Sequence, residues 1–216
     1  MNQALVSLAT VDWLEVLRSL APVATAGIAF AALRNWRRQD KAKRQSEFLD
    51  DLIEATHTYV VEVEKPIEMM RLSRIGMDSH VQNWAEGSEE DKRVAGAIAY
   101  IQKRGEDHGK RLSAILMEAE PALVRLRTLS AKGQMFGFTD YKKCQDAITL
   151  MTWHVGRITS YLSIIQSPSW NWEHPEVRGL LVKVMAIDTD EMRTSIAQNN
   201  VALLTFAQET YQRIYG

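Results

Sequence analysis

The sequence predicts an all-α protein, with an N-terminal single transmembrane helix followed by a cytoplasmic antiparallel bundle of about four to five helices. Apolar residues recur at steps of three and four along most of the chain, which is the period of an amphipathic helix. No stretch alternates apolar and polar residues convincingly, as a half-buried strand would. Near the N-terminus, an uncharged run lies directly before a dense basic cluster, which is typical of a membrane anchor and its cytoplasmic flank.

The composition fits one folded domain with an appendage. Hydrophobic residues make up 46% of the 216 residues and charged residues 25%, and glycine and proline are sparse. Cys144 is the only cysteine, which excludes an internal disulfide and a cysteine zinc cluster. The net charge of -1 hides an asymmetry, because residues 34–44 carry +5 and residues 45–216 carry -5. Since the body is acidic, we expect the basic residues to face a membrane surface and no nucleic acid.

The uncharged run SLAPVATAGIAFAAL, residues 19–33, is the candidate anchor. It is short for a hydrocarbon core of about 30 Å, so the predicted span covers residues 14–34, with Arg18 reaching the headgroups through its long side chain. Trp13 and Trp36 bracket it about 34 Å apart in a helix, near the two aromatic belts of a bilayer. Because basic residues crowd only the C-terminal end, the positive-inside rule places that end in the cytoplasm.

The predicted organisation, in the inner (plasma) membrane, is an exterior N-terminus (1–13), the anchor (14–34), a basic juxtamembrane segment (35–47) and the helical bundle (48–216). The side chains expected to meet anionic headgroups are Arg34, Arg37, Arg38, Lys41, Lys43 and Arg44. Gly27 and Ala31 form a small-xxx-small pair, a surface on which membrane helices pack closely, so a homo-oligomer is expected.

The first helix of the bundle region continues from the basic segment to about Gly76. A kink or break is expected at Pro66, because proline lacks the N–H of a helical hydrogen bond. Ser88 is the predicted N-cap of the next helix, in a variant of the capping box. Gly105 and Gly109 are expected to weaken the middle of that helix and break it there.

The second half of the chain predicts further helices separated by loops. Pro121 starts or kinks a piece that Gly133 ends. The clearest helix covers residues 141–165, with an apolar stripe formed by Tyr141, Cys144, Ile148, Met151, Val155, Ile158, Leu162 and Ile165. The apolar spacing over residues 177–214 predicts one long closing helix.

Trp170 and Trp172 stand two residues apart in the loop SPSWNWEHPE. In an extended loop both side chains would face the same way and offer a partner two aromatic anchors, which makes them the candidate partner surface. The alternative is that both fold back over the end of the bundle as a cap.

No motif predicts catalysis, a cofactor or a metal site. The five histidines form no i, i+3 or i, i+4 pair, and the charged runs at residues 106–108 and 188–191 fit solvated helix faces. Arg74 and His80 match the loose Arg-x4-6-His pattern of HEPN-type ribonucleases, a match that chance alone explains at this composition. We therefore expect no enzyme and no cofactor, and keep the ribonuclease as an alternative only.

The expected function is that of a non-enzymatic, single-pass membrane protein whose cytoplasmic bundle binds an unidentified protein partner or itself, as a scaffold or sensor. Two alternatives remain open. One is a membrane-perturbing effector in which several copies of the short, alanine-rich span assemble. The other is a soluble helical domain whose first helix belongs to the core.

Overall fold

The structure is a computed structural model and describes residues 13–82, 84 and 86–216, with the side chains of residue 18 and of residues 20 onward in these ranges. This part of the chain is helical and contains no strand, which confirms the all-α class. The elements are α1 (Trp13–Asp78), α2 (Glu89–Tyr100), the π-helix η1 (Ile101–Gly105), α3 (Glu106–Gly133), the 3-10 helix η2 (Gln134–Phe136), α4 (Tyr141–Ile165), α5 (Pro175–Met185) and α6 (Thr189–Tyr215). The chain divides into two compact units, residues 1–47 and residues 48–216.

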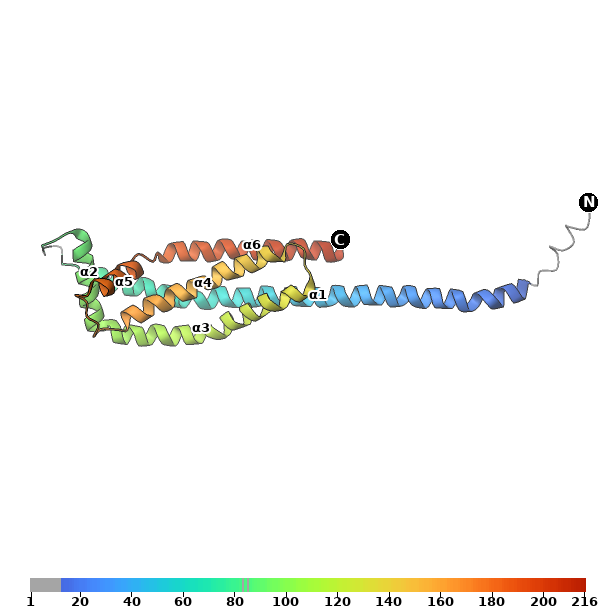
Figure 1. Cartoon of the computed structure of the whole chain (residues 1–216), viewed down its shortest axis with the longest axis horizontal. Helices are drawn as coiled ribbons and strands as arrows, with labels where there is room; N and C mark the ends of the chain where they lie inside the picture. Colours follow the sequence, from blue (N-terminus) through green and yellow to red (C-terminus); the bar gives the residue numbers. More distant parts are fainter. Residues whose placement is uncertain (1–12, 83, 85) are drawn as a thin grey trace, which may run out of the picture. The chain divides into compact units, whose positions relative to one another are not determined.

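The 48–216 unit is a helical bundle, as predicted. Figure 1 shows α3, α4 and α6 running beside the cyan part of α1, while the short helices α2 and α5 gather at one end. α4 packs against both α3 and α6, and α5 contacts α2 and α4. Four long helical segments therefore surround one core, and the short helices close one end of it.

One apolar face of each long helix supplies the core. From α1 it takes Phe48, Leu49, Leu52, Tyr59, Val63, Ile67 and Met70, all at most 2% exposed. The Tyr59 hydroxyl donates to the carbonyl oxygen of Met151 at 2.8 Å and so links α1 to α4 in the interior. The predicted stripe of α4 is confirmed: every member is buried except the partly buried Val155.

Ionic contacts join α1 to α6 along the bundle surface. Arg193 on α6 donates to Glu64 at 2.8 Å and to Glu68 at 2.7 Å, both on α1. The hydrogen bonds from Arg71 and Arg193 hold the pKa of Glu68 at about 2. These contacts accompany the packing of α6 beside α1 and contribute little stability individually, because exposed ion pairs are weak.

The predicted break at Pro66 is wrong, because α1 continues through it to Asp78. Pro121 likewise lies inside α3, so a helix start at Pro121 is wrong. Packing on the neighbouring helices over-rides the lost hydrogen bond at each proline. Ser88 caps α2 as predicted, its hydroxyl oxygen accepting from the Asp91 N–H at 3.1 Å.

The predicted break at Gly105 and Gly109 takes the form of a π-helix, η1, rather than a loop. The chain stays helical there, and η1 widens the turn between α2 and α3. Both glycines face the C-terminal end of α4: a Cβ atom on Gly105 would collide with the carbonyl oxygen of Ile165, and one on Gly109 with Gln166. Glycine is needed here for close helix approach rather than as a breaker.

The predicted closing helix is two helices. α5 ends at Met185, and α6 begins at Thr189 after its N-cap, Asp188. The Asp188 carboxylate accepts from the N–H groups of Asp190 and Glu191, at 2.8 and 3.3 Å. These bonds satisfy helix-end donors and start a new helix although the apolar spacing continues across the boundary.

The predicted transmembrane helix is not supported by the described residues. They form the expected helix at residues 20–33, but no helix within them has a stretch apolar and long enough to cross a membrane. The fifteen uncharged residues 19–33 rise about 22 Å in a helix, against a hydrocarbon core of about 30 Å. The predicted exterior segment up to residue 12 and the side chain of Trp13 lie outside the described residues.

Candidate functional site

Only uncharged side chains cover residues 20–33 of the helix in the 1–47 unit. Every residue from 20 to 33 is uncharged and exposed, and the large side chains are 45% to 71% exposed: Leu20, Val23, Ile28, Phe30 and Leu33. The Thr25 hydroxyl donates to the carbonyl oxygen of Ala21 at 2.8 Å, so its donor is satisfied within the helix. A helix that is apolar all round is typical of a lipid or protein surrounding.

The predicted headgroup contacts follow this segment on the same helix. Trp36 is 63% exposed. The side chains of the basic set are exposed as well: Arg34, Arg37, Arg38, Lys41, Lys43 and Arg44. Arg44 pairs with Asp40 at 2.9 Å and Lys43 with Glu47 at 3.8 Å. Lys43 and Arg44 are therefore engaged in ion pairs within their own helix.

The predicted packing pair, Gly27 and Ala31, is exposed on the same segment. A Cβ atom added to Gly27 would meet nothing within 4 Å. The backbone of a second helix can therefore approach this position closely.

The structure separates the two tryptophans of the candidate partner surface. Trp172 is only 4% exposed, and its indole N–H donates to the carbonyl oxygen of Pro168 at 3.3 Å. Trp170 is 39% exposed, with its ring centroid 6.2 Å from that of Trp172. Trp172 therefore closes the end of the bundle, whereas Trp170 remains at the surface, where a partner protein could contact it.

A groove that the sequence analysis did not predict lies between α1, α3 and α4. Its volume is about 280 Å³, and its walls are largely apolar, with Val63 and Pro66 from α1, Leu116 and Leu123 from α3, and Val155 from α4. We call it the α1–α3–α4 groove. Only the tertiary packing of three helices creates it, so no local sequence signal could have located it.

A polar cluster surrounds η1. The Tyr100 hydroxyl oxygen lies 2.6 Å from Nδ1 of His108, and the hydroxyl of Ser73 lies 3.4 Å from the same nitrogen. Burial lowers the pKa of His108, and the nearby Arg111 and Arg104 lower it further, so the imidazole is neutral at pH 7. These contacts tie His108 of α3 to Tyr100 of α2 and to Ser73 of α1.

Among the described residues, His154 and Ser195 most resemble a catalytic base and its nucleophile. Nε2 of the buried His154 lies 3.0 Å from the Ser195 hydroxyl oxygen, and a guanidinium nitrogen of Arg157 lies 3.3 Å from Nδ1. Because a guanidinium only donates, Nδ1 must accept, and the neutral ring then carries its proton on Nε2. The imidazole therefore donates to Ser195 and cannot take its proton.

Cys144, the histidine and carboxylate groups and the Arg74–His80 pair were the other candidates for chemistry. Cys144 is buried, and burial raises the pKa of its thiol to about 12, so the thiolate is scarce at neutral pH. No three histidine, cysteine or carboxylate side chains lie close enough to hold a metal ion among the described residues. Arg74, half of the ribonuclease-like pair, donates to the carbonyl oxygen of Ile187, whereas Nδ1 of His80 lies 2.9 Å from the carbonyl oxygen of Gly76.

Comparison with known proteins gives no family: no family model matches the chain, and neither a curated protein nor a solved structure matches it.

Proposed function

We propose that the protein is a membrane-attached, non-enzymatic helical bundle that binds a protein partner at the membrane surface. Residues 14–34 anchor the chain with the N-terminus outside, and the bundle of residues 48–216 lies in the cytoplasm. The observation that carries the proposal is the exposed, uncharged helix of residues 20–33, followed directly by exposed cations.

Two properties of this helix support lipid as its surroundings. Its large apolar side chains would be costly in water, at roughly 25 cal/mol per Å² of apolar surface. Leu14, Val16 and Leu17 add apolar side chains before the run, with the charged Glu15 among them, while the stem of Arg18 can carry its charge to the headgroups. Together these residues extend the apolar segment toward the length of a span.

Charge supports the orientation. Anionic headgroups attract the basic residues after the anchor, at about 1 kcal/mol for each one near the surface. Asp12 and Glu15 stand at the other end, so the asymmetry favours a cytoplasmic C-terminal side. An acidic bundle is repelled by the same anionic surface, which leaves its own surface available to a protein.

The described polar groups support a non-enzymatic role. His154 is bonded to Ser195 and His108 to Tyr100, and burial raises the pKa of Cys144, so these three groups are engaged in the fold. A binding function needs none of these groups, only an accessible surface.

A reporter fused to the C-terminus of the full chain tests the proposed orientation. Reversing four charges near the anchor, with Arg34, Arg37, Arg38 and Lys41 changed to Glu, should weaken attachment or invert the orientation. The matched control reverses four charges in the bundle, at Lys132, Lys142, Lys143 and Lys183, and should leave the reporter cytoplasmic. An unchanged orientation in the first variant would contradict the proposal.

A further inference from the structure

Four cations share one face of α1 directly after the uncharged residues 20–33. We call them the basic face: Arg34, Arg37, Arg38 and Lys41. At about 100° per residue, all four fall within about 100° of the helix circumference, and all four are exposed. They line a hollow of about 310 Å³ together with Phe30 and Leu33.

The basic face departs from the charge pattern of the following part of α1. Lys43, Lys65 and Arg71 each pair with a carboxylate three or four residues away. In the basic face, by contrast, the i, i+3 and i, i+4 pairs join one cation to another. Like charges at these spacings destabilise a helix, so an anion that lies between them relieves the repulsion.

No carboxylate supplies that anion among the described residues. Asp40 is the nearest in sequence, but it pairs with Arg44 at 2.9 Å, and none of the four cations of the basic face takes part in an ion pair there. Their charges are therefore available to a ligand.

The arrangement of the four cations fits two phosphate groups. Arg34 and Arg38 stand one helical turn apart, and Arg37 and Lys41 form a second such pair beside them, about 4.5 Å further along the axis. Guanidinium groups donate paired hydrogen bonds to phosphate oxygens, and lysine adds a point charge. Each pair can hold one phosphate, so the basic face complements two phosphates linked by a short bridge.

The apolar end of the hollow favours a lipid over a soluble anion. Phe30 lies four residues before Arg34, on the same side of the helix, and is 68% exposed. Leu33 is 45% exposed beside it. A lipid has phosphate at one end and hydrocarbon at the other, in the same order as the hollow, whereas a soluble polyphosphate would use the cations alone.

From this arrangement we infer that the basic face binds a single phospholipid whose headgroup carries two phosphates. The two phosphates lie on the two cation pairs, and the acyl chains run past Phe30 and Leu33 along the uncharged helix. The inference rests on the membrane attachment in the proposed function and names the class of lipid that the anchor selects.

The test titrates the full chain in an uncharged detergent with cardiolipin or with phosphatidylglycerol, and counts bound lipids by native mass spectrometry. One cardiolipin carries two phosphates and four acyl chains, and two phosphatidylglycerol molecules carry the same groups unlinked. At equal phosphate concentration, cardiolipin should bind about tenfold more tightly and one per chain, because its second phosphate binds as a tethered group. Soluble pyrophosphate, which lacks acyl chains, should not displace it at the same concentration.

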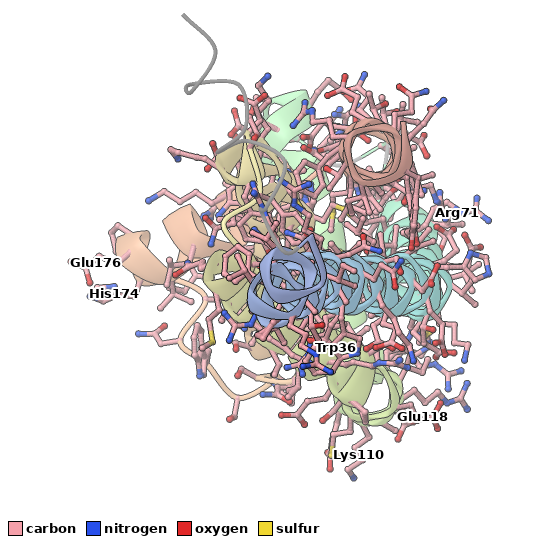
Figure 2. The ribbon with its side chains drawn as sticks, turned by 90° about the vertical axis from the view of Figure 1, so that its right-hand side faces the viewer. Trp36, Arg71, Lys110, Glu118, His174 and Glu176 are labelled. Carbon is pink, nitrogen blue, oxygen red and sulfur yellow. The ribbon has the colours of Figure 1, made fainter. Side chains whose placement is uncertain are left out.

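A permuted variant separates the basic face from the total charge. It combines Arg34→Asn with Asn35→Arg and Arg37→Gln with Gln39→Arg, which keeps the composition and moves two cations toward the side of Trp36. Figure 2 looks along this part of α1 and shows Trp36 beside the helix. The preference for cardiolipin should fall to within about twofold, because each phosphate loses one of its two cations.

An exchange within the bundle is the control for permutation. Gln102→Lys with Lys103→Gln exchanges two exposed residues of η1 and should leave the preference for cardiolipin unchanged.

Equal affinity for the two lipids at equal phosphate, or a preference that the permuted variant keeps, would overturn the inference. Displacement of cardiolipin by pyrophosphate would overturn it as well, because the site would then recognise phosphate without a lipid. Membrane attachment is measured separately by fractionation, and the permuted variant should remain attached because its charge is unchanged. Recovery of the parent chain in the soluble fraction would instead contradict the proposed function.

Discussion

The hydroxyl of Tyr100 lies 2.6 Å from Nδ1 of His108, and η1 stands between the two residues. Eight residues of ideal α-helix turn about 800°, which would leave these side chains about 80° apart around the axis. The wider turn of a π-helix absorbs one extra residue and returns them to nearly the same side. The π-helix and the Tyr100–His108 bond therefore depend on each other.

Replacing Tyr100 with Phe should destabilise the bundle by about 1 kcal/mol, the usual value for one buried hydrogen bond. The ring remains, so packing is largely kept. Amide hydrogen exchange should accelerate within residues 101–105 more than in α4. The same change at Tyr215, which is 65% exposed, is the control and should alter neither quantity. Unchanged exchange at 101–105 would show that the bond does not hold the π-helix.

Stability should fall as the pH drops from 7.5 to 5.5. Burial lowers the pKa of His108 and of His154, with nearby arginines adding to both shifts. The unfolded chain then binds more protons near the ordinary histidine pKa of 6.5, so the free energy of unfolding is lost below it. The lowered carboxyl pKa values, such as that of Glu68 at about 2, act at lower pH.

Urea unfolding at the two pH values measures this dependence. A double variant, His108→Gln with His154→Gln, should flatten the slope with pH even if its absolute stability is lower. The same slope in the variant and the parent would refute the assignment to these two histidines.

Gly105→Ala should destabilise the bundle by about 1–3 kcal/mol, because the added methyl group overlaps the carbonyl oxygen of Ile165. Gly156→Ala lies within α4, where an added Cβ meets nothing within 4 Å, and should stabilise it by about 0.5–1 kcal/mol. Thermal unfolding of the two variants measures the opposite signs. A stabilising effect at Gly105 would contradict the close contact with α4.

Replacing each of the two tryptophans of the loop before α5 with alanine should lower the stability of the bundle by very different amounts. Trp172→Ala should cost about 3–5 kcal/mol, since it empties a buried site. Trp170→Ala should cost less than about 1 kcal/mol, because its ring is partly exposed. Denaturant unfolding followed by circular dichroism separates them, and equal costs would rule out their assignment as cap and surface residue.

The spacing of apolar residues predicted the helices of the bundle, because the apolar face of a helix is formed by residues close in sequence. The stripe of α4, from Tyr141 to Ile165, is buried as expected. The division of α5 from α6 was missed because apolar spacing runs across the boundary. Asp188 carried the available signal, as an N-cap residue followed by an acidic first turn.

Other features depend on contacts between distant segments. Two residues of the same type, Trp170 and Trp172, have different burial because the loop turns one toward the core. Glycines 105 and 109 mark a close approach to α4 that nothing near them in the sequence reveals. The α1–α3–α4 groove likewise needs three helices to be in place before it exists.

Membrane fractionation of the full-length chain tests the central claim most directly. The account predicts that the protein stays with the membrane through an alkaline carbonate wash and is released by detergent, with a C-terminal reporter active only in the cytoplasm. Recovery of the full-length chain in the soluble fraction without detergent would contradict it, and would make residues 20–33 a surface for protein rather than for lipid.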